Sequence, residues 1–177
     1  MSIPRILTTG TSKGLGRYLN EQFGGYAFSR STTTEEYEAF KAEGFDVIIH
    51  AAYNPTKDVT SKNAASYMQD TILLTKKILD IPHKKVVFIS TIDVYPKGAE
   101  KHTEEEVLRL DTTKDVYAFT KLICESLVQE DSKDNVVLRC SAMLGEHMRK
   151  NSIKRIIDEQ NPQLTLSGQS DFNYVLY

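Results

Sequence analysis

This chain of 177 residues has little cysteine, no long apolar run and no excess of positive charge, and each shortage argues against a class of protein. Its two cysteines, Cys124 and Cys140, lie in apolar stretches, so we expect buried thiols rather than a disulfide framework. No apolar run approaches the roughly 20 residues that span a bilayer. The N-terminus lacks the pattern of a signal peptide, so we expect a cytoplasmic protein.

Charge is nearly balanced, since the formal net charge is −2. We therefore expect neither nucleic acid nor an anionic membrane as a partner. The densest basic stretch, residues 147–150 with Lys154 and Arg155 nearby, is most simply interpreted as a solvated helix face. The length predicts a single domain over residues 1–177, and we expect no metal site.

Short apolar segments alternate with segments of helical pattern along the chain. Strands are expected over residues 3–8, 26–29, 47–52, 85–90, 135–140 and 164–166, and helices over 14–23, 33–42, 61–79, 115–129 and 151–159. Some strands are apolar throughout, which is typical of parallel strands buried on both faces. The sequence therefore predicts an α/β fold, a Rossmann-like doubly wound parallel sheet with helices on both faces.

The glycine and polar motifs all follow expected strands. They are the loop at residues 10–16, Arg30, the Ala51-Ala52 pair, and the Ser90-Thr91 pair. Ligands of doubly wound sheets bind beyond the carboxyl ends of the strands. Four placements at the same edge of the sheet therefore indicate a ligand cleft there.

The loop Gly-Thr-Ser-Lys-Gly-Leu-Gly at residues 10–16 lies between an expected strand and an expected helix. Gly10, Gly14 and Gly16 allow a tight turn and a close approach by a pyrophosphate. The amides at the start of the helix, near Leu15, would then face the anion. A plain turn with a helix cap would also use such glycines, but the flanking strand and helix favour a dinucleotide site.

No carboxylate stands at the end of the second strand, where the sequence is Ser29-Arg30-Ser31. An acidic residue there would bind the ribose hydroxyls of NAD, whereas Arg30 is suited to the 2′-phosphate of NADP. Ser12 and Lys13 of the glycine loop could add to that phosphate site. The sequence therefore favours NADP over NAD as cofactor, and the alternative is that Arg30 is simply an exposed surface residue.

Tyr117 and Lys121 are one helical turn apart and so share a helix face. A free phenol has a pKa of about 10 and is a poor base at neutral pH, but a nearby ammonium and an oxidised nicotinamide both favour the phenolate. Tyr117 would then act as a general acid in carbonyl reduction or a general base in alcohol oxidation. Taken alone, this spacing also arises by chance.

Together, and in this order, the three motifs resemble the short-chain dehydrogenase/reductase family, more closely its extended branch of nucleotide-sugar epimerases and dehydratases. The resemblance implies that Thr91, Tyr117 and Lys121 are catalytic. Thr91 would orient the substrate oxygen, and Lys121 would also hold the nicotinamide ribose. Further cofactor contacts are implied for Ser90 and for the Ala51-Ala52 pair, although the alanines also fit a plain core.

Three positions bear on the details of the chemistry. Tyr67 replaces an asparagine that supports a proton relay in many members of the family, and Asp70 replaces a glycine. Asp93 resembles an acidic residue of some dehydratases. No glutamate follows it, so dehydration is disfavoured and a loop-capping role for Asp93 is the alternative.

The resemblance covers about residues 3–145, and residues 146–177 would be a remnant of the family's substrate-binding region. It implies an oxidoreductase or epimerase acting on a small carbonyl or alcohol or on a sugar-like substrate. The intact Thr91, Tyr117 and Lys121 favour this interpretation. The short C-terminal region favours the alternative, a catalytically inactive sensor or partner protein that binds NADP(H).

The expected helices at residues 64–79 and 117–128 each carry a broad apolar stripe. In the first of them we expect Met68, Ile72 and Leu79 to be core. Both stripes look wider than one buried face requires, and in the resembling family these helices pair across a two-fold axis. We therefore expect a homodimer, with deep burial beneath the C-terminal segment as the alternative.

Overall fold

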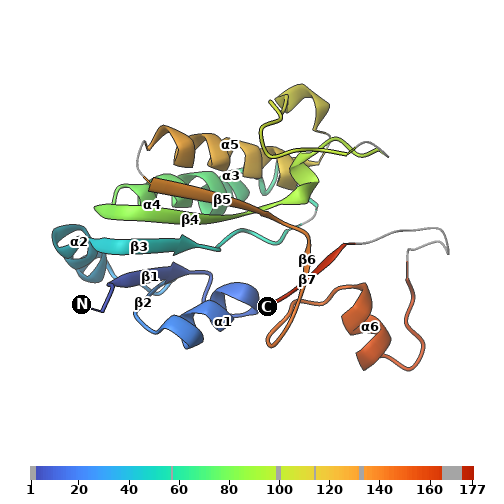
Figure 1. The fold of residues 1–177 in the computed structure, drawn as a ribbon, viewed down its shortest axis with the longest axis horizontal. Helices are drawn as coiled ribbons and strands as arrows, with labels where there is room; N and C mark the ends of the chain where they lie inside the picture. Colours follow the sequence, from blue (N-terminus) through green and yellow to red (C-terminus); the bar gives the residue numbers. More distant parts are fainter. Residues whose placement is uncertain (1–2, 57, 99–100, 114, 132–133, 165–172) are drawn as a thin grey trace.

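The structure, a computed structural model, describes residues 3–56, 58–98, 101–113, 115–131, 134–164 and 173–177. Its main feature is a parallel sheet of five strands in the order β2-β1-β3-β4-β5 (Figure 1). The strands are β1 (Ile6–Thr9), β2 (Tyr26–Phe28), β3 (Phe45–His50), β4 (His83–Thr91) and β5 (Asp134–Cys140). The predicted α/β fold is confirmed, with small shifts in the strand ends.

Helices connect the strands and differ in length. They are α1 (Gly14–Phe23), α2 (Thr34–Glu43), α3 (Ala64–Met68), the π-helical η1 (Gln69–Leu73), α4 (Leu74–Leu79), the short 3₁₀ turns η2 (Ile92–Val94) and η3 (Leu110–Thr112), α5 (Val116–Glu130) and α6 (Ser152–Asp158). A reciprocal cap begins α2, because the Thr33 hydroxyl accepts from the Glu36 amide and the Glu36 carboxylate accepts from the Thr33 amide.

The two faces of the sheet carry different numbers of helices. With right-handed connections, this strand order puts α1 on one face and α2 to α5 on the other. Figure 1 agrees, with α3, α4 and α5 grouped along β4 and β5 and α1 beside β1. The core lies under the larger group, where sheet residues Leu7, Ile48, Val86 and Phe88 pack with helix residues Phe40, Ile72, Ile78, Cys124 and Val128.

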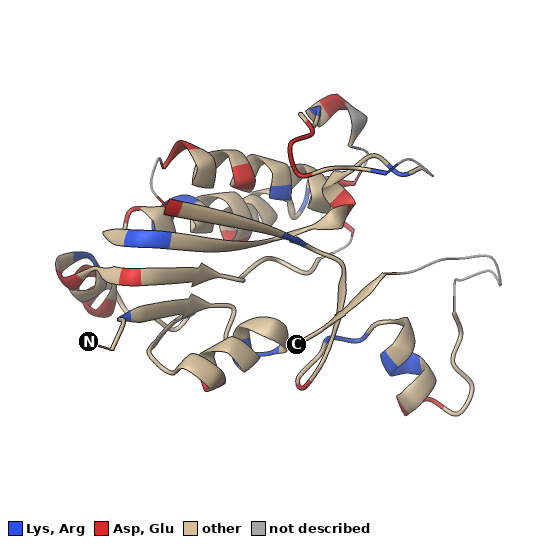
Figure 2. Ribbon diagram, viewed as in Figure 1, with Lys and Arg blue, Asp and Glu red and all other residues tan. Residues whose placement is uncertain are grey.

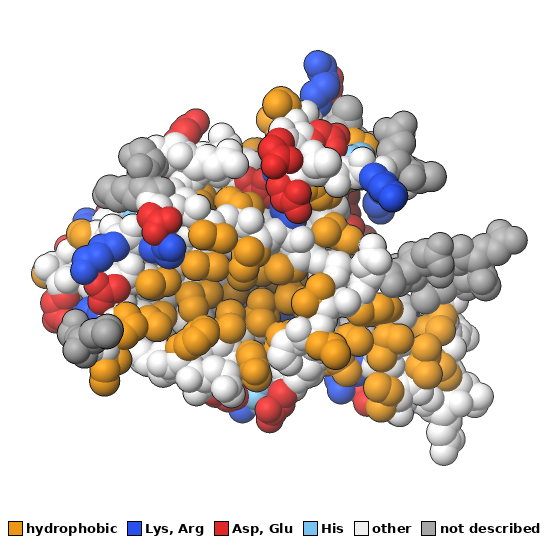
Figure 3. Space-filling view, in the orientation of Figure 1, with side chains coloured by type: hydrophobic (Ala, Val, Ile, Leu, Met, Phe, Trp, Pro, Cys, Tyr) orange, Lys and Arg blue, Asp and Glu red, His pale blue; other side chains and the backbone are white. Residues whose placement is uncertain are grey.

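The opposite face of β3, β4 and β5, here termed the open face, is poorly covered by the described residues. Its side chains alternate along the strands with those of the core and include the half-buried Val47, Val87 and Val136. Leu138 on β5 is 43% exposed. Figure 3 shows an apolar surface over this side of the sheet, and Figure 2 shows charged residues mainly on helices and at strand starts.

The long helix expected over residues 61–79 contains a π-helical turn in its middle. The α-helical segments α3 and α4 are joined through η1, which holds more residues per turn than an α-helix. Residues before this turn are therefore rotated about the helix axis relative to those after it. Ile72 is buried and Leu79 packs against the core, but Met68 is 42% exposed. The prediction that Met68 belongs to the core was wrong for this reason.

The C-terminal region differs most from expectation. Two unpredicted strands, β6 (Ala142–Leu144) and β7 (Tyr174–Leu176), form a separate parallel pair. The strand predicted at residues 164–166 lies largely outside the described residues, and Leu164 is not in a strand. Residues 147–150 are not helical; instead the Met148 amide donates to the Gly145 carbonyl at 3.2 Å and closes a turn over residues 145–148.

Three further properties bear on function. Cys124 is buried, Cys140 is half-buried, and both are free thiols. In the described part of the chain, no helix has the length and apolar character needed to cross a membrane. The same described residues contain no group of three or more His, Cys, Asp or Glu side chains arranged to hold a metal ion.

Candidate functional site

The glycine loop is built for close contact with the neighbouring strand end. Gly10 has a φ of 74°, and a Cβ placed on it would lie 3.0 Å from the Ala51 carbonyl carbon and from the Ala52 nitrogen. A Cβ on Gly16 would lie 2.6 Å from the Gly10 carbonyl oxygen. Side chains at these two positions would push the loop off β3 and lift α1 off the loop, so the sequence keeps both free of a Cβ.

A buried polar network beneath the loop was not anticipated from the sequence. The Thr9 hydroxyl oxygen accepts from the Ala51 and Ala52 amides, at 3.1 and 3.0 Å, and lies 2.7 Å from His50 Nδ1. His50 Nε2 lies 2.9 Å from the Thr75 hydroxyl oxygen, and that hydroxyl donates to the Thr71 carbonyl. The network ties the ends of β1 and β3 to α4. Its only signal in the sequence is polar residues at the ends of apolar strands.

The pattern of donors requires a neutral His50. Because Thr9 Oγ1 accepts two amide protons, its own proton goes to Nδ1, and Nε2 donates to Thr75. A second ring proton on Nδ1 would have no acceptor. Burial, and secondarily the charge of Lys121, lowers the pKa of His50 to about 3. His50 is therefore a structural residue buried beneath the glycine loop.

The start of α1 lies against the C-terminal segment. The Gly14 amide donates to the His147 carbonyl oxygen at 2.9 Å, and His147 has a φ of 64°. The Arg149 guanidinium carbon lies 4.3 Å from the centre of the Tyr53 ring, and the Arg149 side chain passes 3.5 Å from a Cβ placed on Gly14. Ser12 and Lys13 are exposed and Leu15 is half-buried. The loop at residues 145–150 thus lies over the glycine loop.

Arg30 stands at the carboxyl end of β2, as predicted, and its side chain is 81% exposed. Its Nη2 lies 2.6 Å from Oδ2 of Asp70, which belongs to η1. The Asn54 side-chain amide donates to the same oxygen at 3.2 Å. Arg30 is therefore paired with a carboxylate in the chain alone, which sequence reasoning did not foresee.

Thr91, Tyr117 and Lys121 come together at the carboxyl end of β4. Asp115 caps α5 by accepting from the Tyr117 amide at 2.8 Å, which fixes Tyr117 in the first turn. The Tyr117 ring lies 5.2 Å from the Tyr53 ring. Lys121 is buried and donates to the Ile89 carbonyl oxygen at 2.7 Å, so its ammonium is held against β4.

Burial sets the protonation of this group. It raises the pKa of the Tyr117 phenol, as do Tyr53 and Asp93, whereas a hydrogen bond with Thr91 lowers it. It lowers the pKa of Lys121 to about 8. The sequence-based expectation of a lowered tyrosine pKa relied on an oxidised nicotinamide as well as on Lys121, and in the chain alone burial outweighs the lowering effects of Thr91 and Arg149. Asp93 accepts from the Thr91 hydroxyl at 3.1 Å, consistent with the loop-capping alternative.

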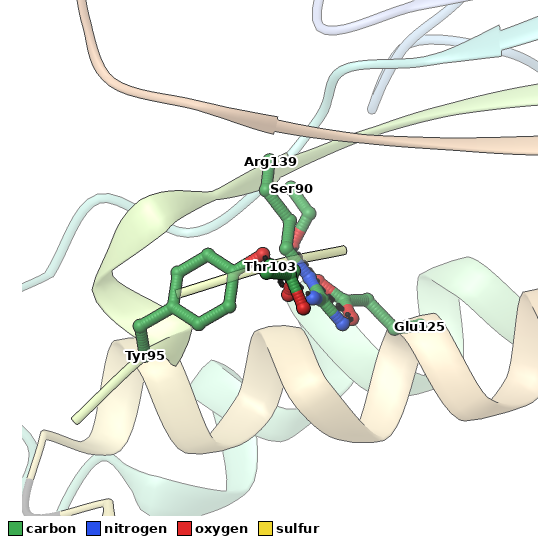
Figure 4. Close-up of polar contacts among 5 residues, drawn as sticks. All are labelled: Ser90, Tyr95, Thr103, Glu125 and Arg139. Carbon is green, nitrogen blue, oxygen red and sulfur yellow. Dashed lines mark hydrogen bonds and ion pairs between the residues drawn. The ribbon is translucent and has the colours of Figure 1, made fainter. Parts of the chain in front are cut away.

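Ser90 belongs to a different cluster, shown in Figure 4. Its hydroxyl donates to the buried Glu125 carboxylate, which also pairs with the Arg139 guanidinium at 2.8 Å. Arg139 donates to the Tyr95 hydroxyl at 2.9 Å, and Tyr95 donates to the Thr103 carbonyl at 3.2 Å. The Ser90 side chain therefore joins β4 to α5, and its hydroxyl proton is not free for the predicted cofactor contact.

Tyr67, at the position of the family's asparagine, is buried, and its hydroxyl lies 3.3 Å from the Thr120 hydroxyl. Thr120 in turn donates to the Tyr117 carbonyl at 2.9 Å. Tyr67 therefore supports the first turn of α5 by packing and by a hydrogen bond.

Comparison with known proteins gives the family. Residues 20–172 match the model of the NAD dependent epimerase/dehydratase family. The chain belongs to this family. The match begins within α1, so the glycine loop is supported by its geometry alone. No curated protein matched the chain.

Solved structures of this fold include enzymes of epimerase and reductase type. UDP-glucuronic acid 4-epimerase from Bacillus cereus, in complex with its sugar nucleotide and NAD, superposes with a TM-score of 0.78 and 17% identity over 97% of this chain and 69% of that chain. UDP-N-acetylglucosamine 4-epimerase from Methanobrevibacter ruminantium gives 0.74 and 17% over 99% and 70%. dTDP-4-dehydrorhamnose reductase from Bacillus anthracis, in complex with NADP, gives 0.73 and 19% over 88% and 59%. At these identities the likeness establishes the shared fold.

Proposed function

We propose that this family member is an oxidoreductase or epimerase that uses a nicotinamide dinucleotide and acts on a sugar-like or small carbonyl or alcohol substrate. The observation that carries the proposal is the grouping of Thr91, Tyr117 and Lys121 at the edge of the sheet that also carries the glycine loop. Such a grouping supplies a proton donor at the edge of the sheet where doubly wound folds bind a dinucleotide. The two epimerases and the reductase of similar fold are consistent with it.

Each residue has a role that its contacts support. When bound, the dinucleotide would accept a hydride from the substrate or donate one to it. Tyr117 donates a proton to a carbonyl oxygen, or takes one from a hydroxyl, and its raised pKa in the chain alone keeps the phenol protonated, which is the form that a donor needs. Thr91, already hydrogen-bonded to Tyr117, positions the substrate oxygen. Lys121, held by the Ile89 carbonyl, is in place to reach the ribose and to favour the phenolate.

For the cofactor itself we propose NADP in preference to NAD. Arg30 at the end of β2 is a cation with no acidic neighbour on that strand end, and Ser12 and Lys13 in the glycine loop are exposed. Gly10, Gly14, Leu15 and Gly16 would line the pyrophosphate, with Ala51 and Ala52 opposite. The Gly14 amide is occupied by the His147 carbonyl, and Arg149 of the same loop lies beside the glycine loop. For a pyrophosphate to bind, residues 145–150 would have to shift, or Arg149 would contribute an additional cation.

We also propose that residues 146–177 are part of the substrate region and that the protein is a homodimer in a cytoplasmic setting. Exposed apolar residues on α3, η1 and α5, namely Met68, Leu73, Val116 and Phe119, support a contact through these helices. Light scattering at micromolar concentration tests the dimer. A monomer of 20.0 kDa, unchanged by cofactor, would contradict it.

The alternative is a protein that binds NADP(H) without turnover. The observation in its favour is that residues 145–150 lie over the glycine loop, through the His147 carbonyl and Arg149. This arrangement would restrict exchange of a dinucleotide and of a substrate. Tight cofactor binding without oxidation of NADPH, across a panel of keto sugars and small ketones, would favour this alternative.

The test of the main proposal is Tyr117→Phe. Because only the phenolic proton is lost, turnover should fall by at least 100-fold, the order expected for removing a general acid, while dinucleotide affinity stays within twofold. Tyr37→Phe is the matched control, since the Tyr37 hydroxyl bonds to the Lys77 carbonyl and Asp80 far from the cleft. A Tyr117→Phe protein with full activity would refute the assignment.

A further inference from the structure

The Arg30–Asp70 pair lies where a dinucleotide's adenosine ribose would meet the end of β2. In doubly wound folds a carboxylate at that strand end binds the ribose hydroxyls, and an arginine there accommodates a 2′-phosphate. This chain places the arginine on β2 and the carboxylate on η1, and joins them at 2.6 Å. The chain therefore has both the arginine that would favour NADP and the carboxylate that would favour NAD, and the two side chains form an ion pair.

The Asp70 carboxylate is held in place from a second side. The Asn54 side-chain amide donates to the same carboxylate oxygen at 3.2 Å, and Asn54 itself is buried and accepts from the Thr56 amide at 3.0 Å. Asp70 is less exposed than its partner, at 31% against 81% of the side chain. The carboxylate is thus held by two neighbours, whereas the arginine is the more exposed member of the pair.

The backbone around Asp70 is also unusual. Asp70 lies in the π-helical turn η1, and such turns are frequent at functional sites. The Thr71 hydroxyl donates to the Tyr67 carbonyl at 2.7 Å, which stabilises the turn from within. The turn breaks the α-helical phase between α3 and α4, and it is the segment from which Asp70 reaches Arg30.

We propose that Asp70 is a residue that determines dinucleotide specificity, by competing with a 2′-phosphate for Arg30; this inference rests on the proposed function as a dinucleotide-dependent enzyme. A 2′-phosphate that binds Arg30 must displace Asp70 and then lies near its negative charge. A ribose without the phosphate leaves the pair intact and offers hydroxyls that the carboxylate accepts. Asp70 therefore weakens the preference for NADPH that Arg30 would otherwise produce.

The experiment is titration calorimetry of NADPH and of NADH on the full chain and on Asp70→Asn. We expect Asp70→Asn to tighten NADPH binding about fivefold, the size of an exposed ion pair, and to leave NADH within twofold or slightly weaker. Adding Arg30→Ala to Asp70→Asn should abolish the gain, because the gain is produced by the released guanidinium.

Asp80→Asn is the matched control. Asp80 is the C-terminal cap of α4, about 15 Å along the same helix from Asp70, and it also forms an exposed ion pair, with Lys41 at 3.1 Å. It makes the same change in net charge, so it should leave the ratio of the two affinities unchanged.

The outcomes separate this inference from the proposed function. An affinity ratio that is equal in wild type and Asp70→Asn, with both dinucleotides bound, overturns the role of Asp70 alone. The role of Asp70 is also overturned if Asp80→Asn changes the ratio of NADPH to NADH affinity as much as Asp70→Asn does, because the effect would then come from the change in net charge. Failure of both dinucleotides to bind any variant overturns the proposed function, and this inference with it.

Discussion

The two faces of the sheet are made from alternate residues of the same strands and yet differ greatly in packing. Phe88 on β4 is 1% exposed beneath η1, α4 and α5, whereas Leu138 on the neighbouring strand is 43% exposed on the open face. A continuous apolar strand indicates burial on both faces, but among the described residues the second face is covered less completely, most clearly at Leu138. The apolar pattern of a strand therefore indicates which faces favour burial, but it does not indicate which other segment covers them.

The same contrast applies to polar groups. On the helix-covered face, His50, Glu125 and Lys121 are buried, and each has a hydrogen-bond partner. These contacts position the candidate site, because they fix the cleft wall, α5 and the loop after β4. Stability and site geometry thus both depend on the covered face. The predictions below test this, beginning with the largest effect.

Phe88→Ala should lower the free energy of unfolding by about 3 to 5 kcal/mol, because it leaves a cavity between the sheet and α5. Urea denaturation followed by circular dichroism measures the change. A loss below about 1 kcal/mol would mean that the covered face is not the core of the molecule.

Acidification should weaken the covered face through His50. Its pKa is about 3 in the folded chain and about 6.5 when unfolded, so between these values only the unfolded state binds the proton. Stability from this group is therefore complete above pH 6.5 and is lost as the pH falls toward 3. At pH 5 the loss is about 2 kcal/mol. His50→Gln should remove this dependence.

The measurement compares denaturation midpoints at pH 7.5 and pH 5 for wild type and His50→Gln. The variant is destabilised at both values because it disturbs the bonds to Thr9 and Thr75, but the gap to wild type should narrow at pH 5. A gap that stays constant between the two pH values would show that His50 takes up a proton equally in both states.

Leu138→Ala should have the smallest effect, about 1 kcal/mol or less, because the side chain is already partly in water. Chemical denaturation at several protein concentrations measures it. If Leu138→Ala lowers the free energy of unfolding as much as Phe88→Ala does, another segment covers the open face in solution. If the stability of the wild type falls when the protein is diluted, another copy covers it.

Much of the fold followed from local pattern. The five sheet strands, α1 over residues 14–23 and the Thr33 cap follow from apolar runs, glycine turns and capping chemistry, which act over a few residues. The placement of Arg30, Thr91, Tyr117 and Lys121 at one edge followed from topology, since parallel strands bring their carboxyl ends together.

What was missed depends on distant residues. The pairing of Asp70 with Arg30 joins residues 40 positions apart, and Asp70 lies in the π-helical turn that follows the exposed Met68. The Thr9–His50 bond spans 41 positions, and the contact of His147 with Gly14 joins the two ends of the domain. No local propensity encodes these contacts, because each is decided by how finished elements pack.

The hydrogen bonds of Thr9 have a consequence for how the cleft opens. The Ala51 and Ala52 amides lie beyond the end of β3, yet both are held by a side chain in the buried seam between β1 and β3. We expect them to exchange with deuterium as slowly as strand amides, since release requires that seam to separate. The Gly14 amide is held by one carbonyl from a surface loop and should exchange much faster. We therefore expect residues 145–150 to separate from the glycine loop more readily than β1 separates from β3.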